Sequence, residues 1–163
     1  MRIEPLDHHP LVAATKIHAV MLLAHAQEAR LLQAEPFAPM AREPADIQAS
    51  NEYFIGAFRG DELLGCVSLG PDDEPGQISI ALLIVHPAHQ RQGIARALMA
   101  EALRRSAGLV LSVATGAQNT PALALYGQLG FVVYRHGTLG AEALQIVKLR
   151  RAAGATPAEP DAP

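Results

Sequence analysis

Blocks of hydrophobic and polar residues divide the chain into strands and helices. Residues 2–6 predict a short strand, and residues 10–34, rich in Ala and Leu, predict a long helix. Prolines between residues 36 and 44 break the chain, and residues 46–51 then predict a short helix. Two apolar runs on either side of Gly60-Asp61 predict a β-hairpin.

The run ISIALLIV, residues 78–85, is almost continuously apolar, which predicts a strand buried on both faces and stopped by Pro87. The elements predicted after it are a helix over 93–107, a strand over 109–115, a helix over 120–129, a strand over 131–136 and a last strand within 142–149. The whole order is β-α-α-β-β-β-α-β-α-β-β. One strand-helix-strand step among hairpins predicts an α/β (α+β) fold, with a mixed sheet flanked by helices.

Length and composition indicate a globular protein. The 163 residues, half of them hydrophobic, predict a single domain, which we assign to residues 1–149. Residues 150–163 are rich in Pro and Ala and predict a flexible tail. The net charge of −3 gives no sign of a nucleic-acid partner. No apolar stretch is long enough to predict a membrane span or a signal peptide, and the single cysteine, Cys66, agrees with a cytoplasmic location.

The charge is unevenly distributed along the chain. Residues 35–75 carry nine acidic side chains against Arg42 and Arg59, whereas residues 86–105 carry four arginines against Glu101. These segments are either two solvated surfaces or the neighbourhoods of a cationic and an anionic ligand.

Residues 90–93, Gln-Arg-Gln-Gly, stand where the apolar strand passes into a helix. A helix start leaves about four backbone N–H groups without partners and carries a partial positive charge, so this junction is a candidate anion site. Gly93 and Ala95 leave the backbone open, and Arg91 and Arg96 add charge. Taken alone, an ordinary turn explains the stretch better. The chain has no other phosphate-loop motif and no metal-ligand spacing among its histidines, so we predict no metal.

A second cluster is NTPALALYGQLGF, residues 119–131. Asn119 or Thr120 can cap a helix, Pro121 suits its first turn, and Gly130 supplies its end. Tyr126 falls near the end of that helix, and taken alone it is explained as a packing residue.

Together the two clusters resemble the GNAT superfamily of acetyl-CoA-dependent N-acetyltransferases over residues 78–134. The first cluster matches the pattern [QR]-x-x-G-x-[GA] with Gln90, Arg91, Gln92, Gly93, Ile94 and Ala95. The second is similar to N-x-x-A-x-x-L-Y-x-x-x-G-F, with Asn119, Ala122, Leu125, Tyr126, Gly130 and Phe131.

The resemblance implies acetyl-CoA as cosubstrate and an amine as acceptor. In such folds the parallel strand pair splays apart. The amides from Arg91 to Arg96 would hold the pyrophosphate, and the strand edge at Ile84 and Val85 would pair with the pantetheine arm. Asn119 would touch the pantetheine or stabilise the cleft, and Tyr126 would protonate the departing thiolate. The implied coenzyme-binding residues are Ile84, Val85, Arg91, Gln92, Gly93, Ile94, Ala95, Arg96 and Asn119.

The chain departs from the family at the general base. Many members carry a glutamate on the central strand, where this chain has Ser79 and Ala81. An alkylammonium of pKa about 10 must lose a proton before it attacks. The proton could pass through water to one of several side chains, or the substrate could have a lower pKa; these side chains are Glu28, Asp72, Glu74 and His86.

Three interpretations of the chain follow. The leading one is an N-acetyltransferase that acts on a small amine or on a peptide or protein amino group by direct attack in a ternary complex. The missing strand glutamate favours a second, a non-catalytic acyl-CoA-binding regulatory module on the same fold. The third is a plain structural domain, which would not bind CoA. The resemblance also allows a homodimer, although no sequence feature requires one.

Overall fold

The structure is a computed structural model that describes residues 1–32, 42–141 and 143–155. Within these residues, strands form a mixed sheet in the order β1-β2-β3-β4-β5-β7-β6. Only β4 (Gln77–Val85) and β5 (Val110–Gly116) pair in parallel among the described strand pairs, with Gln77 to Ile80 opposite Val110 to Val113. The predicted mixed sheet is confirmed.

The chain divides into two compact units, each described here by itself. The first comprises residues 1–70 and 81–105, and the second comprises residues 71–80 and the described residues from 106 onward. Strand β4 contributes to both, because its first four residues belong to the second unit and its last five to the first.

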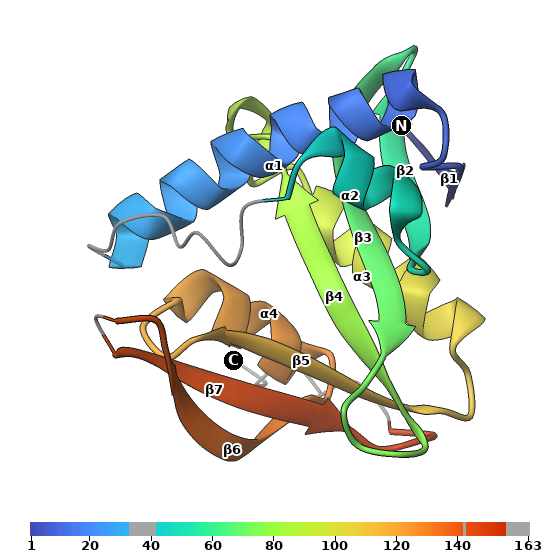
Figure 1. Cartoon of the computed structure of the whole chain (residues 1–163). Coiled ribbons are helices and arrows are strands. Elements are labelled where there is room, and N and C mark those ends of the chain that lie inside the picture. Colours follow the sequence, from blue (N-terminus) through green and yellow to red (C-terminus); the bar gives the residue numbers. More distant parts are fainter. Residues whose placement is uncertain (33–41, 142, 156–163) are drawn as a thin grey trace. The chain divides into compact units, whose positions relative to one another are not determined.

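The first unit is built from strands with helices on both faces (Figure 1). Its complete elements are β1 (Arg2–Leu6), α1 (Leu11–Leu32), α2 (Pro44–Ala49), β2 (Tyr53–Arg59), the 3-10 helix η2 (Pro87–His89) and α3 (Ile94–Arg105). Its sheet also contains strand β3 (Glu62–Pro71), except for Pro71, and the last five residues of β4. Apolar residues of α1 and α2 bury one face of this sheet, with Ile17, Met21 and Ile47 packed in a cluster that includes Phe54 and Ile84.

The β2–β3 hairpin forms where the sequence predicts it. Gly60 has a positive φ of 60°, which the tight turn needs and which a glycine adopts without strain. Farther along β3, Gly65 faces the backbone of β4, and a Cβ atom there would lie 2.5 Å from the carbonyl oxygen of Ile84. The close approach of β3 to the end of β4 therefore depends on the absence of a side chain.

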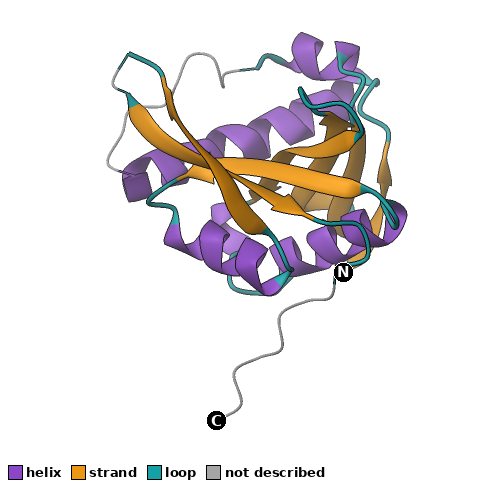
Figure 2. Ribbon diagram, turned by 90° about the horizontal axis from the view of Figure 1, so that it is seen from below, coloured by secondary structure: helices purple, strands orange, loops and turns teal. Residues whose placement is uncertain are grey.

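The second unit contains α4 (Thr120–Gln128) and the strands β5, β6 (Val132–Leu139) and β7 (Leu144–Arg151), and Figure 2 shows the ribbon from below. Its buried side chains include Leu111, Val113, Phe131 and Leu149. The guanidinium of Arg151 donates to the carbonyl of Leu129 (2.8 Å), which ties the end of β7 to the turn after α4.

The order of elements agrees with the sequence prediction, and η2 is added to it. The prediction that β4 is buried on both faces is wrong: Ile80, Leu82 and Ile84 are buried, whereas Ala81 is exposed and Leu83 is half-buried. Successive strand residues point to opposite faces, and the apolar cluster of the first unit takes only the alternate positions.

The boundary predicted for the C-terminal tail is shifted. Strand β7 continues through Arg151, because Arg150 and Arg151 pair with Ser112 and Leu111 of β5. The end of the predicted first helix at residues 33–34 and the tail residues 156–163 lie outside the described residues. The single domain over residues 1–149 stays a prediction.

Candidate functional site

In the first unit, the loop that resembles a pyrophosphate site is an exposed turn leading into α3. Gln90, Arg91, Gln92 and Gly93 are all exposed, and Ile94 at the start of the helix is buried. Arg91 and Gly93 have positive φ values of 60° and 78°, so the backbone turns sharply at both residues. A Cβ on Gly93 would meet nothing within 4 Å.

This turn places the start of α3 at an open surface. The helix begins at Ile94, and the first N–H groups of any helix point out of its N-terminal end. The partial positive charge of these groups suits an anion that approaches over Gly93. Arg96 is exposed in the first turn of the helix.

Side chains from three other elements hold the same turn. Gln27 of α1 and Gln90 form a reciprocal amide pair, in which Gln27 donates to Gln90 at 3.0 Å and Gln90 donates back. Arg59 at the end of β2 donates to Gln92 (3.4 Å). His89 pairs with Glu62 of β3 at 2.9 Å. These contacts have no local signal in the sequence, since the partners come from distant elements.

The end of β4 leads directly into the turn. The backbone N–H of His86 donates to the carbonyl of Leu64 (2.8 Å), and the His86 ring accepts from the N–H of Ala88 (3.0 Å). Ile84 is buried in the apolar cluster beneath α1, and Val85 is half-buried. The strand edge predicted for the pantetheine arm thus leads through His86 and η2 into the turn.

In the second unit, Asn119 is the N-cap of α4, the first of the two candidates that the sequence offers, and Thr120 is the first residue of the helix. Its side-chain oxygen accepts from the N–H of Ala122 (3.3 Å), and its amide group donates to the hydroxyl of Thr115 (3.3 Å). Tyr126 is only 5% exposed, and its ring lies 5.7 Å from that of Phe131 between centroids. The tyrosine is therefore packed among the buried side chains of the second unit.

The two positions of β4 where family members commonly have a glutamate lie in different units. Ala81 is exposed in the first unit, and Ser79 is half-buried in the second. In the first unit the side chains of Glu52 and Ala81 both border Gly70, where a Cβ would lie 3.2 Å from Glu52 Cγ and 3.9 Å from Ala81 Cβ. From the sequence alone, Glu52 is only one charge of the acidic segment 35–75.

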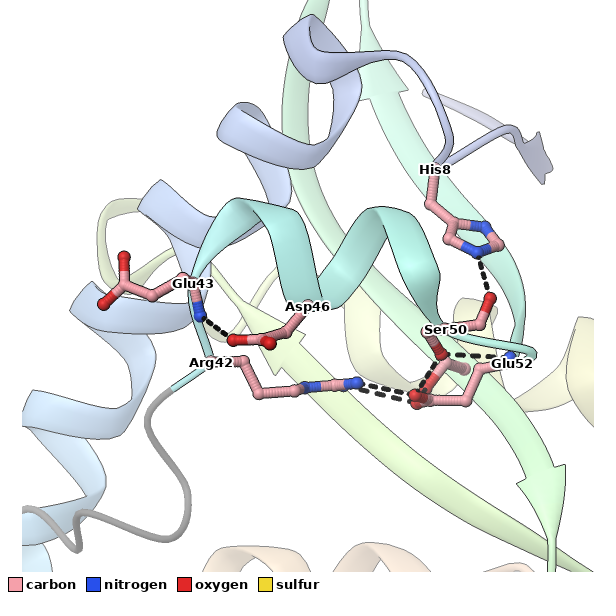
Figure 3. Close-up of polar contacts among 7 residues, drawn as sticks. His8, Arg42, Glu43, Asp46, Ser50 and Glu52 are labelled. Carbon is pink, nitrogen blue, oxygen red and sulfur yellow. Dashed lines mark hydrogen bonds and ion pairs between the residues drawn. The ribbon is translucent and has the colours of Figure 1, made fainter.

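The acceptor capacity of Glu52 is already taken up (Figure 3). Its carboxylate accepts from the Arg42 guanidinium (2.6 and 3.3 Å), from Ser50 (2.5 Å) and from the buried Ser68 (2.6 Å). Burial raises the pKa of Glu52, but these hydrogen bonds outweigh it and keep the pKa below its ordinary value. A fully hydrogen-bonded carboxylate of lowered pKa is a weak proton acceptor, so Glu52 is a structural group.

Two of the suggested proton acceptors, Asp72 and Glu74, are similarly occupied in the second unit. Asp72 accepts from Lys148 (2.7 Å) and from Ser112 (2.8 Å), and its side chain is 3% exposed. Burial raises the pKa of Asp72, but its hydrogen bonds bring it below the ordinary value. The pKa of Glu74 is also lowered, mainly by the hydrogen bond from Arg135 (2.9 Å) and further by one from Tyr134.

The same unit has a cavity of about 330 Å³ on its sheet. Ser79 of β4, Ala114 of β5, His136 of β6 and Ile146 of β7 line it, together with charged side chains from residues 71–73 and from β6 and β7. His136 and the cavity itself had no sequence signal, because they depend on which strands become neighbours.

A possible metal-ligand group lies in the first unit. Asp7, His8 and His9 offer ligand atoms within 4.8 Å of one another, and these side chains are already hydrogen-bonded: His9 pairs with Asp7 (2.7 Å) and His8 with the carbonyl of Ser50 (2.7 Å).

No helix among the described residues is long and apolar enough to cross a membrane.

Comparison with known proteins gives a consistent result. The model of the acetyltransferase (GNAT) family matches residues 20–131. The chain is 33% identical to the UPF0157 protein YqkA of Bacillus subtilis over 130 residues, covering 79% of this chain but only 37% of that protein. It is 30% identical to the N-alpha-acetyltransferase RimI of Mycobacterium tuberculosis over 115 residues, covering 66% of this chain and 73% of RimI.

Solved structures share the fold. The PaiA N-acetyltransferase of Thermoplasma acidophilum, solved in complex with coenzyme A, superposes with a TM-score of 0.70 at 18% identity, covering 91% of this chain and 98% of that chain.

Proposed function

The chain belongs to the acetyltransferase (GNAT) family, a family of enzymes, and on that premise we propose that it transfers an acetyl group from acetyl-CoA to a primary amine. The similarity to RimI, an N-alpha-acetyltransferase, and to an N-acetyltransferase that binds coenzyme A supports an amine acceptor and this cosubstrate. We propose direct attack in a ternary complex, without a metal and in the cytoplasm; a homodimer is compatible with this scheme.

The observation that carries the proposal is the turn before α3. A diphosphate needs several N–H donors and an open approach, and this turn offers both at Gly93 and at the first amides of the helix. The residues proposed to bind the coenzyme are Ile84, Val85, Arg91, Gln92, Gly93, Ile94, Ala95, Arg96 and Asn119.

Bound acetyl-CoA would supply a thioester carbonyl as the electrophile. Negative charge grows on the carbonyl oxygen as the amine attacks, and a backbone N–H of a parted strand would stabilise it, typically by about 3 kcal/mol. We propose Tyr126 as the acid that protonates the leaving thiolate. A phenol of ordinary pKa about 10 is well matched to a thiolate of similar basicity, and such acid catalysis contributes about 10²–10⁴-fold.

A second candidate is an acyl-CoA-binding regulatory module on the same fold. The observation that favours it is the replacement of the strand glutamate by Ser79 and Ala81. Both candidates require CoA binding, and they differ in turnover.

The test is a CoA-release assay on the purified chain with a panel of polyamines, aminoglycosides, amino acids and peptides. We expect turnover with at least one amine and a loss of 10²-fold or more in kcat for Tyr126→Phe, with the KM for acetyl-CoA unchanged. Turnover unaffected by Tyr126→Phe would remove the tyrosine from the mechanism. CoA binding without turnover on any amine would favour the regulatory module.

A further inference from the structure

The cavity of the second unit is bordered by charges of both signs, most of which are already matched. Asp72 and Lys148 form an ion pair (2.7 Å), and Arg135 pairs with Glu74 (2.9 Å), which stands just outside the lining. The hydroxyl of the buried Ser112 also donates to Asp72 (2.8 Å). These pairs leave little unbalanced charge on their side of the cavity.

Two other residues of the cavity, Asp73 and His136, do not belong to these ion pairs. Both line the cavity, and among the described residues neither side chain makes a hydrogen bond or an ion pair. The backbone N–H of Asp73 donates to Asp72 (2.8 Å), which fixes the main chain that carries its carboxylate. The cavity thus presents one unmatched anionic group and one unmatched imidazole, beside Ser79 and the apolar side chains of Ala114 and Ile146.

We propose that this cavity receives the acceptor amine, with Asp73 binding its ammonium group and His136 acting as the general base. The inference rests on the proposed function. It assigns the role of general base, which the strand glutamate has in many family members, to His136. In the step, one ammonium N–H bond breaks, its electron pair stays on the amine nitrogen, and the proton forms an N–H bond on the imidazole. The imidazolium returns that proton to water before the next turnover.

Relative basicity decides between the candidate bases. An alkylammonium has a pKa of about 10, a carboxylate about 4 and an imidazole about 6.5. Proton transfer from the amine is therefore unfavourable by about 10⁶-fold toward an ordinary carboxylate, but by only about 3,000-fold toward an imidazole. Asp72 and Glu74 are weaker bases still, because their pKa values are lowered. Of the groups lining the cavity, His136 is best suited to the proton transfer.

The same charges predict which amines fit. Lys148 and Arg135 are each paired with a carboxylate, so the cavity has no unmatched cation to receive a carboxylate of the ligand. The unmatched Asp73 favours a positive charge. The acceptor is accordingly a primary alkylamine, or an α-amine whose neighbouring carboxyl is an amide, rather than a free amino acid.

The test compares alaninamide with alanine as acceptors for the full chain, with Asp73→Asn and His136→Gln as variants. Asp61→Asn and His9→Gln are matched controls, since both residues are exposed in the first unit and outside the proposed machinery. We expect wild type to favour alaninamide in kcat/KM by tenfold or more. Asp73→Asn should raise the KM for alaninamide about tenfold without changing that for acetyl-CoA.

His136→Gln should lower kcat by 10²-fold or more and remove the acid limb of the kcat/KM profile against pH. The charged groups that border His136 in the cavity are Asp72, Asp73, Arg135 and Lys148. The pKa of Asp72 is lowered and the pKa values of Arg135 and Lys148 are raised, which moves these three groups away from pH 5.5–8.5, and the Asp73→Asn variant shows whether Asp73 contributes to the limb. Wild-type pH dependence and kcat in His136→Gln, or an unchanged amine KM in Asp73→Asn, would overturn the inference.

Amine binding without acetyl-CoA separates this inference from the proposed function. The imidazole NMR signals of His136, assigned by their loss in His136→Gln, should shift on addition of alaninamide in wild type and in Asp61→Asn but not in Asp73→Asn. Such shifts in a protein that acetylates none of the amines would uphold the amine site while the proposed function fails. Turnover without any shift would overturn the amine site alone.

Discussion

Gly65 of β3 is the position where one added methyl group most directly disturbs the end of β4. In Gly65→Ala the new Cβ would stand 2.5 Å from the carbonyl oxygen of Ile84 and 3.2 Å from the Cα of Val85. Both neighbours are backbone atoms, so no side chain can rotate away. The strands must separate locally, next to the hydrogen bond from the His86 N–H to the Leu64 carbonyl (2.8 Å).

The expected cost has two parts. Overpacking against a fixed neighbour typically costs about 1–3 kcal/mol, and a weakened backbone hydrogen bond adds about 1 kcal/mol. We therefore expect the free energy of unfolding to fall by about 2–4 kcal/mol, which lowers the Tm by roughly 6–12 °C for a chain of this size. Because Ile84 and Val85 form the proposed pantetheine edge, the Kd for acetyl-CoA should also rise about tenfold or more. A tenfold rise corresponds to a loss of about 1.4 kcal/mol of binding free energy.

Urea unfolding followed by circular dichroism and calorimetric titration with acetyl-CoA measure the two effects. Gly127→Ala is the matched control, because a Cβ at Gly127 meets nothing within 4 Å and the residue lies inside α4. This control should be neutral or stabilise the protein by about 0.5–1 kcal/mol. A Gly65→Ala protein within 0.5 kcal/mol of wild type, or no more destabilised than Gly127→Ala, would refute the reasoning.

Three further predictions concern single residues. Gly93→Ala forces alanine into a φ of 78° and should cost about 1–2 kcal/mol in unfolding experiments while weakening acetyl-CoA binding at least tenfold by calorimetry; an unchanged Kd would remove the turn from the coenzyme site. Asn119→Ala loses the cap on Ala122 and should destabilise the protein by about 1 kcal/mol, whereas Asn119→Asp keeps the acceptor and most of the stability; equal losses in both variants would contradict the capping role. The folded-state pKa of Asp72 lies below its ordinary 3.8, so its stabilisation is complete above pH 4 and is lost as the pH falls through the lower, folded value. Asp72→Asn should cost about 3 kcal/mol at pH 7, since Lys148 loses its partner, and should flatten the acid side of the stability curve; parallel curves for variant and wild type would argue against the pair.

Most of the fold could be predicted because its signals are local. A long stretch rich in Ala and Leu indicates α1, and the pair Gly60-Asp61 marks the hairpin between strands that are adjacent in sequence. The burial of β4 was the error, since an apolar run does not say whether one or both faces will be covered. That depends on which helices pack on the sheet.

The candidate site divides in the same way. The turn at Gly93 and the cap at Asn119 are set by neighbours within a few residues, and the family motifs lie on these two segments. The general base had no local signal. The side chains proposed for the acceptor, Asp73 and His136, are 63 positions apart in sequence and border one cavity through the strand order of the second unit.

By itself the sequence determined the order of helices and strands, the glycine that opens the turn into α3, and the family motifs, because each depends on interactions between near neighbours along the chain. Only the tertiary structure decided that Asp72 and Glu52 are bound by cations and hydroxyls, that Gly65 touches the backbone of β4, and that His136 stands at a cavity. These facts require the register of strands far apart in sequence, and a register is fixed by packing of the whole sheet.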